Sequence, residues 1–459
     1  MERPQMGNTS LRATGKKTGH KESVHTMAEI RPFRAWRYNE QLSKEIEALT
    51  SPLFDVVSEK QRDKLYQNPL NSIHISVPLG NNPALKAKEI LHHWKTEGII
   101  VQDPLPGIYV YYQYFTLPGS KKEFCRKGFI CFIKAYDWEE KVLLRHENTI
   151  PKAVNDRTEL LDTTQLNASP THGLYSDPQF ELEAYMDESM KFPIYETEDY
   201  QGVRDVLSVI HDAKTIRKFM SFIDAKQIIL ADGHHRYTGS LSYRKSQMAA
   251  NPGNSGNEGF HYHMMFLTNM ESDDLRILPT HRLIAGLQNF DSSELLDKLS
   301  NYFTVKEVEN EDDINEIILG KKWAFGLIFQ DRAYKVRLIP EVLTKMHWNF
   351  PDEIKKLDLT IMHYFIIEKC LGIPGAQQRT SEHISYERNF IDCLTKVKDG
   401  NAQLALITQE ISMEEVKKVC FSGYTLPQKS TYFYPKVITG FLFGSIKHDE
   451  FSPLPYACF

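Results

Sequence analysis

The clearest pattern of hydrophobic and polar positions lies near the middle of the chain, between residues 226 and 249. Its first part, Ile228 to Ala231, is a short run of apolar and β-branched residues, which is typical of a buried strand. Asp232 and Gly233 then favour a turn, and the amphipathic stretch that follows is long enough for a helix of three to four turns. The pattern therefore predicts a strand, a glycine turn and a helix in direct succession.

Comparable patterns on both sides of this unit predict further strands and helices. Strands are expected at 71–77, 107–117, 126–136, 203–210, 261–269, 403–408 and 438–444, with a hairpin at 323–339. Helices are expected at 59–67, 83–98, 155–168, 178–190, 212–222, 291–302, 357–371 and 412–420. Because strands and helices are interspersed without an internal repeat, we expect an α/β to α+β fold with mixed sheets.

The length of 459 residues exceeds what one ordinary hydrophobic core holds, so we expect two or three lobes. We divide the chain into an N-terminal α/β lobe at 27–150, a central lobe at 151–290 and a C-terminal α/β lobe at 291–459. Residues 1–26 are polar and lack the apolar core of a secretory signal, and we interpret them as a disordered tail.

The overall charge narrows the choice of partners. A net charge of −5 and a pI near 6.4 provide no general attraction to nucleic acid or to an anionic membrane. No apolar run approaches the length of a membrane-spanning helix. The six cysteines are scattered without a CxxC pair, which favours free thiols in a reducing compartment and hence a cytoplasmic protein.

The predicted turn at Asp232 and Gly233 has the features of an anion site. The first N–H groups of a helix lack partners within the helix, and the helix dipole is positive at that end. Gly233 allows the backbone to approach a ligand closely, and Arg236 can bring a bidentate guanidinium to the same place. The same spacing also fits an ordinary turn with two surface histidines, His234 and His235, behind it.

Two further stretches combine residue types that suit phosphate chemistry. His146 beside Glu147 supplies an imidazole and a carboxylate, the usual groups for proton transfer, and the second histidine of a zincin motif is absent. An ion-pair cluster at a helix start is the alternative for this stretch. The segment 426–436 is a proline-bounded loop that contains two ammonium groups and two hydroxyls, or else a rigid edge loop packed by its aromatic residues.

Several segments together resemble the domain-of-unknown-function family 1015. They are DGHHRY after an apolar strand, the stretch from Arg145 to Arg157, LRILPTHRLI at 275–284 and PQKSTYFYPK at 427–436. The resemblance covers roughly Met27 to Phe443. Within the central motif, GHHRYTGS is also similar to the phosphate-binding box of the ParB and sulfiredoxin superfamily. This second resemblance implies a central lobe with a ParB/sulfiredoxin-like core that holds a phosphate at the strand–turn–helix junction.

The superfamily includes nucleotide-hydrolysing partition proteins and an ADP-dependent free-serine kinase. The resemblance therefore implies a small-molecule enzyme that transfers or hydrolyses a phosphoryl group, with serine or phosphoserine as the reactant. A nucleotide (ADP or ATP) and Mg²⁺ are the implied cofactors, and the implied partner is a small phosphorylated ligand rather than nucleic acid or a membrane. Two alternatives stay open: a nucleotide-binding switch of the ParB-like class without metabolic turnover, and a structural family whose motif buries a salt bridge.

The site hypothesis assigns residues to two roles and assigns none to a metal. The catalytic candidates are His146, Glu147, His234 and His235. The phosphate- or nucleotide-binding candidates are Asp232, Gly233, Arg236, Arg282, Lys152, Arg157, Lys429, Ser430, Thr431 and Lys436. If these residues serve one site, segments separated by almost 300 positions must meet in one cleft.

Overall fold

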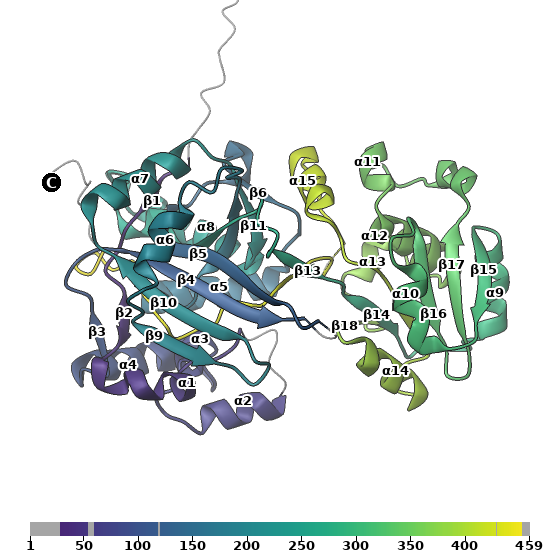
Figure 1. Cartoon of the computed structure of the whole chain (residues 1–459), viewed down its shortest axis with the longest axis horizontal. Helices are drawn as coiled ribbons and strands as arrows, with labels where there is room; N and C mark the ends of the chain where they lie inside the picture. The colour runs from purple at the N-terminus through teal and green to yellow at the C-terminus, as the bar shows by residue number, and fades with distance from the viewer. Residues whose placement is uncertain (1–27, 54–58, 118–119, 428, 452–459) are drawn as a thin grey trace, which may run out of the picture.

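The structure is a computed structural model that describes residues 28–53, 59–117, 120–427 and 429–451, and Figure 1 shows two lobes of unequal size. The larger lobe contains a nine-stranded sheet and the smaller lobe a six-stranded sheet. The predicted mixed α/β architecture in several lobes is confirmed. The tail expected at 1–26 lies outside the described residues.

The larger sheet is mixed. Its strands follow the order β6-β11-β8-β12-β5-β4-β10-β9, and β1 pairs with β5. The pairs β6–β11 and β8–β12 are parallel, and the others are antiparallel. The strands are β1 (Ile30–Arg31), β4 (Ile108–Thr116), β5 (Glu123–Lys134), β6 (Leu143–Arg145), β8 (Thr171–Tyr175), β9 (Tyr195–Glu198), β10 (Arg204–Ile210), β11 (Ile228–Asp232) and β12 (Tyr262–Asn269).

Both faces of this sheet are buried because alternate residues of its central strands fill two different hydrophobic clusters. In β5, Ile130 and Phe132 pack with α4 (Pro83–Thr96) on one side. Phe129, Cys131 and Ile133 pack with α6 (Glu183–Ser189) and α7 (Ala213–Asp224) on the other. The sheet is therefore the interior of the lobe.

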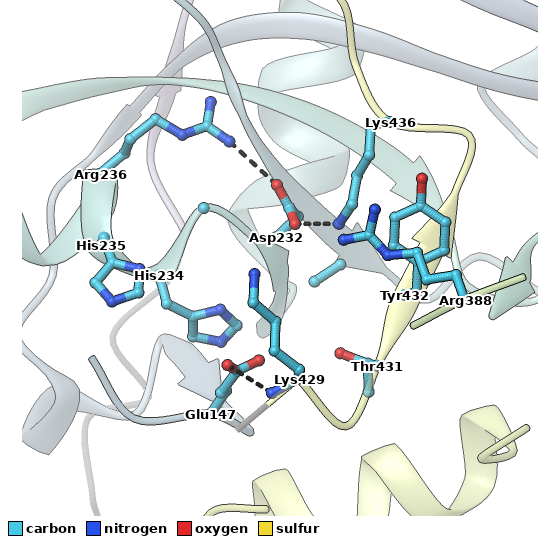
Figure 2. A pocket seen from close by; sticks show the side chains of 12 residues that line it. Glu147, Asp232, His234, His235, Arg236, Arg388, Lys429, Thr431, Tyr432 and Lys436 are labelled. Carbon is cyan, nitrogen blue, oxygen red and sulfur yellow. Dashed lines mark hydrogen bonds and ion pairs between the residues drawn. The ribbon is translucent and has the colours of Figure 1, made fainter. Parts of the chain in front are cut away.

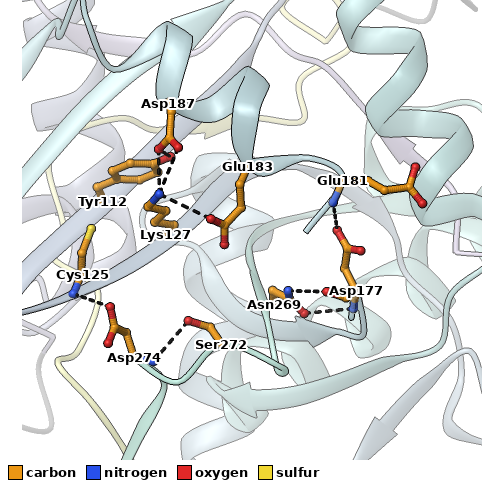
Figure 3. Close-up of polar contacts among 10 residues, drawn as sticks. All are labelled: Tyr112, Cys125, Lys127, Asp177, Glu181, Glu183, Asp187, Asn269, Ser272 and Asp274. Carbon is orange, nitrogen blue, oxygen red and sulfur yellow. Dashed lines mark hydrogen bonds and ion pairs between the residues drawn. The ribbon is translucent and has the colours of Figure 1, made fainter. Parts of the chain in front are cut away.

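Polar contacts fix α6 on its face of the sheet, as Figure 3 shows. Lys127 of β5 lies 2.8 Å from Asp187 and 3.4 Å from Glu183, both on α6. The hydroxyl of Tyr112 donates to the same Asp187 at 2.7 Å. Strands β4 and β5 thus hold α6 through these polar contacts as well as through the apolar cluster beneath the helix.

The smaller lobe is antiparallel throughout its sheet, which has the order β15-β17-β16-β19-β14-β18. The strands are β14 (His281–Ile284), β15 (Phe303–Val308), β16 (Ala324–Ile328), β17 (Ala333–Leu338), β18 (Ile384–Glu387) and β19 (Leu404–Ile407). Its helices are α9 (Ser292–Ser300), α10 (Ile314–Ile318), α11 (Asp352–Lys355), α12 (Asp358–Ile361), α13 (Gly375–Gln378) and α14 (Phe390–Lys398). The helix expected at 357–371 begins as α12 but continues as a π-helix, η6 (Met362–Cys370).

The end of the chain returns to the larger lobe after α15 (Met413–Ser422). Strand β20 (Tyr432–Tyr434) pairs with β13 (Arg276–Leu278), and Phe443 bridges to Trp36. The boundary expected at residue 150 does not separate two sheets, because strands from both sides of it share the nine-stranded sheet. The last segment of the lobe expected at 291–459 packs with the larger sheet.

The central prediction is confirmed: β11 ends at Asp232, Gly233 follows, and α8 (His234–Ala250) begins immediately. Helix α5 (Pro151–Thr164) packs beside α8. The other elements are α1 (Ile46–Leu49), α2 (Glu59–Tyr66), β2 (Trp36–Tyr38), β3 (Ile100–Gln102), β7 (Leu166–Asn167) and β21 (Gly444–Ser445). Of the strand expected at 438–444, only Gly444 lies in a strand, as the first residue of β21.

The strand expected at 71–77 is wrong. Residues Ile73–Ser76 form the one-turn helix α3. Asn71 is responsible, since its side-chain oxygen accepts from the N–H of Ile73 at 2.9 Å and its amide donates to the carbonyl of Thr50 at 2.8 Å. Side chains of this kind compete with strand hydrogen bonding by binding the backbone locally.

The described residues contain neither a membrane-spanning helix nor a disulfide bond. No helix within the described part is long and apolar enough to cross a membrane. Five of the six cysteines are described and none of these five forms a disulfide, as their spacing predicts. The sixth, Cys458, lies outside the described residues.

Candidate anion-binding site

The site begins at one edge of the larger sheet, where two parallel strands end side by side. Strands β6 and β11 are parallel neighbours, with Arg145 opposite Leu230. Glu147 follows β6 by two residues, and Asp232 is the last residue of β11. Because parallel strands present their carboxyl ends at the same edge, the two carboxylates face one recess although 85 positions separate them.

Gly233 makes the sharp transition from strand to helix. Its φ angle of +89° lies in the left-handed region, which glycine adopts without steric cost. A Cβ at this position would lie 2.5 Å from Cγ2 of Thr171 and 3.0 Å from a guanidinium nitrogen of Arg236. The backbone therefore passes close to β8, and the N-terminus of α8 is directed at the recess.

Asp232 binds two cations, which Figure 2 shows on either side of its carboxylate. One oxygen accepts from Arg236 at 3.1 Å, and the other forms an ion pair with Lys436. Burial alone would raise the pKa of Asp232, but the charges of Lys436 and Arg236 outweigh it and hold this pKa well below its usual range. Asp232 is thus an ionised anchor for two cations.

The loop that contains Lys436 is fixed from below by buried side chains of the large sheet. Gln113 donates to the backbone carbonyl of Lys436 at 3.0 Å, and Arg126 donates to that of Pro435. Tyr432 begins β20, the strand that leads into this loop, and its ring centroid is 5.0 Å from Nζ of Lys436 and 3.8 Å from Cζ of Arg388. Arg388 follows β18, so the smaller lobe contributes a cation to the site.

Glu147 lies across the recess from Asp232 and contacts Lys429. Its carboxylate accepts from the backbone N–H of Lys429 at 3.1 Å, and Lys429 has a φ of +57°. Burial raises the pKa of Glu147, while that N–H and the ammonium of Lys429 partly oppose the shift. A carboxylate with a raised pKa is a stronger base when it is ionised.

Two of the three histidines at the site, His146 and His234, are buried and neutral. The rings of His146 and His234 meet edge to face with centroids 4.8 Å apart. Burial lowers the pKa of His146 to about 4 and the pKa of His234 well below its usual value. Nε2 of His235 accepts from the N–H of Ile150 at 3.0 Å, which assigns the ring proton to Nδ1 when the ring is neutral.

These residues line a small pocket of about 70 Å³. The lining residues are Glu147, Ala231, Asp232, Gly233, His234, His235, Arg236, Arg388, Lys429, Thr431, Tyr432 and Lys436. The structure therefore brings together nine of the fourteen candidates named from the sequence. Four cations surround the pocket against two carboxylates, one of which has a raised pKa.

The remaining candidates lie outside the pocket lining. His146 stands behind it, and its Nε2 is 2.7 Å from the Thr431 hydroxyl. Ser430 is buried and donates to the carbonyl of Pro427 at 2.5 Å. Arg157 donates to the carbonyl of Ser76 at 2.8 Å, and Lys152 is exposed at the start of α5.

Arg282 is the candidate that the structure moves furthest from its expected role. It belongs to β14 of the smaller sheet, is fully buried and donates to the carbonyl of Thr280. Its guanidinium carbon lies 5.4 Å from the ring centroid of Tyr386. Arg282 is therefore a buried cation beneath the site rather than part of the pocket lining.

Arg388 and Tyr432 were not identified from the sequence. Tyr432 lies inside the 426–436 loop, and its position between Lys429 and Lys436 is the signal that could have included it. Arg388 lies in a segment without a chemical motif, and only the packing of the smaller lobe brings it to the pocket. Over the described residues, no cluster of three or more His, Cys, Asp or Glu side chains could hold a metal ion.

Comparison with known sequences defines the class of the protein. The family model described as Protein of unknown function (DUF1015) matches residues 30–360, which is well over half of the chain. The chain belongs to this family, as its motifs predict. No curated protein sequence matches it. The similarity of GHHRYTGS to the ParB/sulfiredoxin box stays a prediction.

Several solved structures are similar at low identity. A conserved hypothetical protein from Pyrococcus furiosus is 13% identical with a TM-score of 0.33, over 68% of this chain and 95% of that one. A free serine kinase in complex with AMP is 13% identical with a TM-score of 0.33, over 68% and 92%. C-terminally truncated SbnI from Staphylococcus aureus is 11% identical with a TM-score of 0.32, over 68% and 85%. The reaction proposed below rests on the pocket geometry, and the reactants proposed for it rest on the motif resemblance described above.

Proposed function

We propose that this protein is an enzyme that transfers or hydrolyses a phosphoryl group of a small molecule. The observation that carries the proposal is the meeting of Arg236, Arg388, Lys429 and Lys436 around one small recess at the N-terminus of α8. Since Asp232 and Glu147 are the only carboxylates among the described residues that line this pocket, the recess favours an anion. Its size suits a phosphoryl group rather than a whole nucleotide.

In this proposal the phosphate oxygens accept from the first N–H groups of α8, and the cations neutralise their charge. Arg236 and Lys436 are kept in place by Asp232, so they are preorganised before the ligand arrives. Catalysis of phosphoryl transfer consists mainly of such positioning and charge stabilisation, because the protein has little covalent chemistry of its own to perform. Asp232 then acts through its two cations and not by contact with the phosphate.

Glu147 is the proposed general base. The oxygen of an acceptor hydroxyl or of water forms the new bond to phosphorus, its proton passes to the Glu147 carboxylate, and the bond from phosphorus to the leaving oxygen breaks. The raised pKa of Glu147 supports this role, and the low pKa values of His146 and His234 do not support either ring as the proton acceptor at neutral pH. His235 is the remaining candidate for proton transfer.

Serine or phosphoserine is the reactant to test first, with ADP or ATP as the phosphoryl partner. Both carboxylates of the pocket already have partners. Asp232 pairs with the cations of Arg236 and Lys436, and Glu147 accepts a hydrogen bond from the backbone N–H of Lys429. A Mg²⁺ ion is therefore expected to enter with the nucleotide phosphates, which bind it together with water. A ligand-driven switch is the alternative, favoured by one observation: Arg388 joins the pocket from the smaller lobe.

The deciding experiment is steady-state turnover of purified protein with ADP or ATP plus serine, and with phosphoserine alone, each with and without Mg²⁺. Glu147→Gln should lower turnover by about 10²–10⁴-fold while ligand binding survives. Glu159→Gln, on the exposed face of α5, is the matched control and should behave as wild type. Binding of nucleotide without product in any protein would instead identify a switch.

A further inference from the structure

A second and larger pocket shares a wall with the anion-binding pocket. It has a volume of about 660 Å³ and lies at the junction of the two lobes. Three segments line both pockets with different residues. The first segment is β18 with the residue after it: Tyr386 lines the larger pocket, and Arg388 lines the anion-binding pocket. The second segment surrounds Glu147: Arg145 and Asn148 line the larger pocket, and Glu147 lines the anion-binding pocket.

The third shared segment is the loop after α15. Leu426 and Pro427 line the larger pocket, and Lys429 and Thr431 line the anion-binding pocket. Because neighbouring residues of the same three segments line both pockets, the two pockets are adjacent on the Lys429 side of the anion-binding pocket. The larger pocket falls in the usual size range of small-molecule sites.

Aromatic side chains form one wall of the larger pocket. Phe350 meets Trp348 edge to face at 5.7 Å between ring centroids, and it meets Tyr424 in the same way at 5.6 Å. Tyr424 is 36% exposed, so an aromatic ring stands at the mouth rather than in the core. Such surfaces stack planar rings independently of their detailed pattern of hydrogen bonds.

One residue that lines this pocket, His363, carries a buried hydrogen-bond acceptor. Gln378 donates through Nε2 to the carbonyls of His363 and Ile373, so its oxygen accepts from Nδ1 of His363 at 2.8 Å. Nδ1 therefore holds the proton, and Nε2 of His363 is a bare acceptor. It is buried and has no hydrogen-bond partner among the described residues. His363 belongs to the π-helix η6, a rare element that is frequent at functional sites.

The charges around the pocket select among possible planar ligands. Arg145 and Arg379 line it, and the buried guanidinium of Arg282 lies beneath the ring of Tyr386. The acidic lining residue Glu368 is already paired with Lys369 at 2.9 Å, so the cations are in excess. These cations disfavour a positively charged ligand, although aromatic walls alone would accept one. A neutral heteroaromatic ring with an N–H donor satisfies both the aromatic wall and the acceptor of His363.

We propose that the larger pocket binds the heteroaromatic base of a nucleotide whose phosphate end occupies the anion-binding pocket. This inference rests on the proposed function, since it takes the anion-binding pocket as the phosphate site. It adds the part of the ligand that a phosphate pocket cannot select. The base is recognised by stacking on the aromatic wall and by donation of an N–H to His363.

The test compares ligands that differ only in the base. Calorimetry with ADP, GDP, CDP, UDP and pyrophosphate should show at least one nucleoside diphosphate binding at least tenfold more tightly than pyrophosphate. Tyr424→Ser and His363→Phe should each remove at least tenfold of that nucleotide affinity and leave pyrophosphate affinity unchanged. Phe421→Ser is the matched control, because Phe421 is 63% exposed three residues away and does not line the pocket.

Two outcomes would overturn the inference: every nucleotide binds no more tightly than pyrophosphate, or Tyr424→Ser leaves nucleotide affinity as in wild type. Tyr424 is at the surface, so its variant remains informative if His363→Phe does not fold. The proposed function fails differently. In that case pyrophosphate does not bind, or nucleotide binds through the larger pocket and no phosphoryl group is transferred.

Discussion

The ammonium of Lys436 pairs with the carboxylate of Asp232 across 204 positions of sequence, and this pair joins the last loop of the chain to the end of β11. The same carboxylate binds Arg236, which donates in addition to the carbonyl of Pro170 at 2.6 Å. One anion therefore sets the positions of two of the four cations in the pocket. The site depends on this contact before any ligand binds.

Asp232→Asn should destabilise the protein by about 3 kcal/mol, because it leaves two largely buried cations without their anion. The side chains of Lys436 and Arg236 are only 9% and 12% exposed. The folded-state pKa of Asp232 is lowered from 3.8, so its contribution to stability is present above about pH 4 and is lost as the pH falls further. Urea unfolding at pH 7 and pH 3 should show a smaller difference between variant and wild type at the lower pH; an equal difference would contradict the ion-pair role.

Arg388→Met should weaken phosphate binding without leaving an unpaired carboxylate. Its guanidinium stacks on Tyr432, and no ion pair to a carboxylate is found for it within the described residues. We expect a loss of about 1.5–3 kcal/mol in pyrophosphate affinity, typical of a hydrogen bond to a charged group. Calorimetry checks this, with Lys152→Met as the exposed-cation control. Unchanged affinity would remove the smaller lobe from the anion-binding pocket.

Lys429→Met should shift the acid limb of the pH–rate profile to higher pH. Burial raises the pKa of Glu147 above 4.5, and the charge of Lys429 opposes that shift. Activity that needs ionised Glu147 falls as the pH drops through this pKa, so removal of the opposing charge moves the fall upward. The profile of kcat is the measurement, since Lys429 also affects binding. An acid limb that does not move would exclude Glu147 as its source.

Gly233→Ala should destabilise the protein by about 2 kcal/mol and reduce anion binding. The residue would keep a left-handed φ, and its Cβ would approach Cγ2 of Thr171 to 2.5 Å. Thr171→Ser removes that methyl and keeps the hydroxyl that lies 3.0 Å from His263. The double variant should therefore recover part of the lost stability in thermal unfolding. No recovery would show that backbone strain alone sets the cost.

The anion-binding site could be predicted from the sequence where its signals are local. The apolar run of β11, the glycine after Asp232 and the helical pattern beyond it are encoded within about 25 residues, and the structure contains each element there. Local patterns fail where a distant contact decides between two conformations. Alternation at Ile73 and Ile75 indicated a strand, but Asn71 binds the backbone at Ile73 and Thr50 and stabilises a helical turn.

The sequence by itself determined which residue types the site contains: a carboxylate after β6, a glycine and arginine at the start of α8, and two lysines in the last loop. Only the tertiary structure decided which of them meet. It buried Arg282 under Tyr386, left Lys152 at the surface and brought Arg388 across from the smaller lobe. The physical reason is that turns and caps depend on neighbours in sequence, whereas convergence depends on the order of strands in two sheets and on the return of the chain end between them.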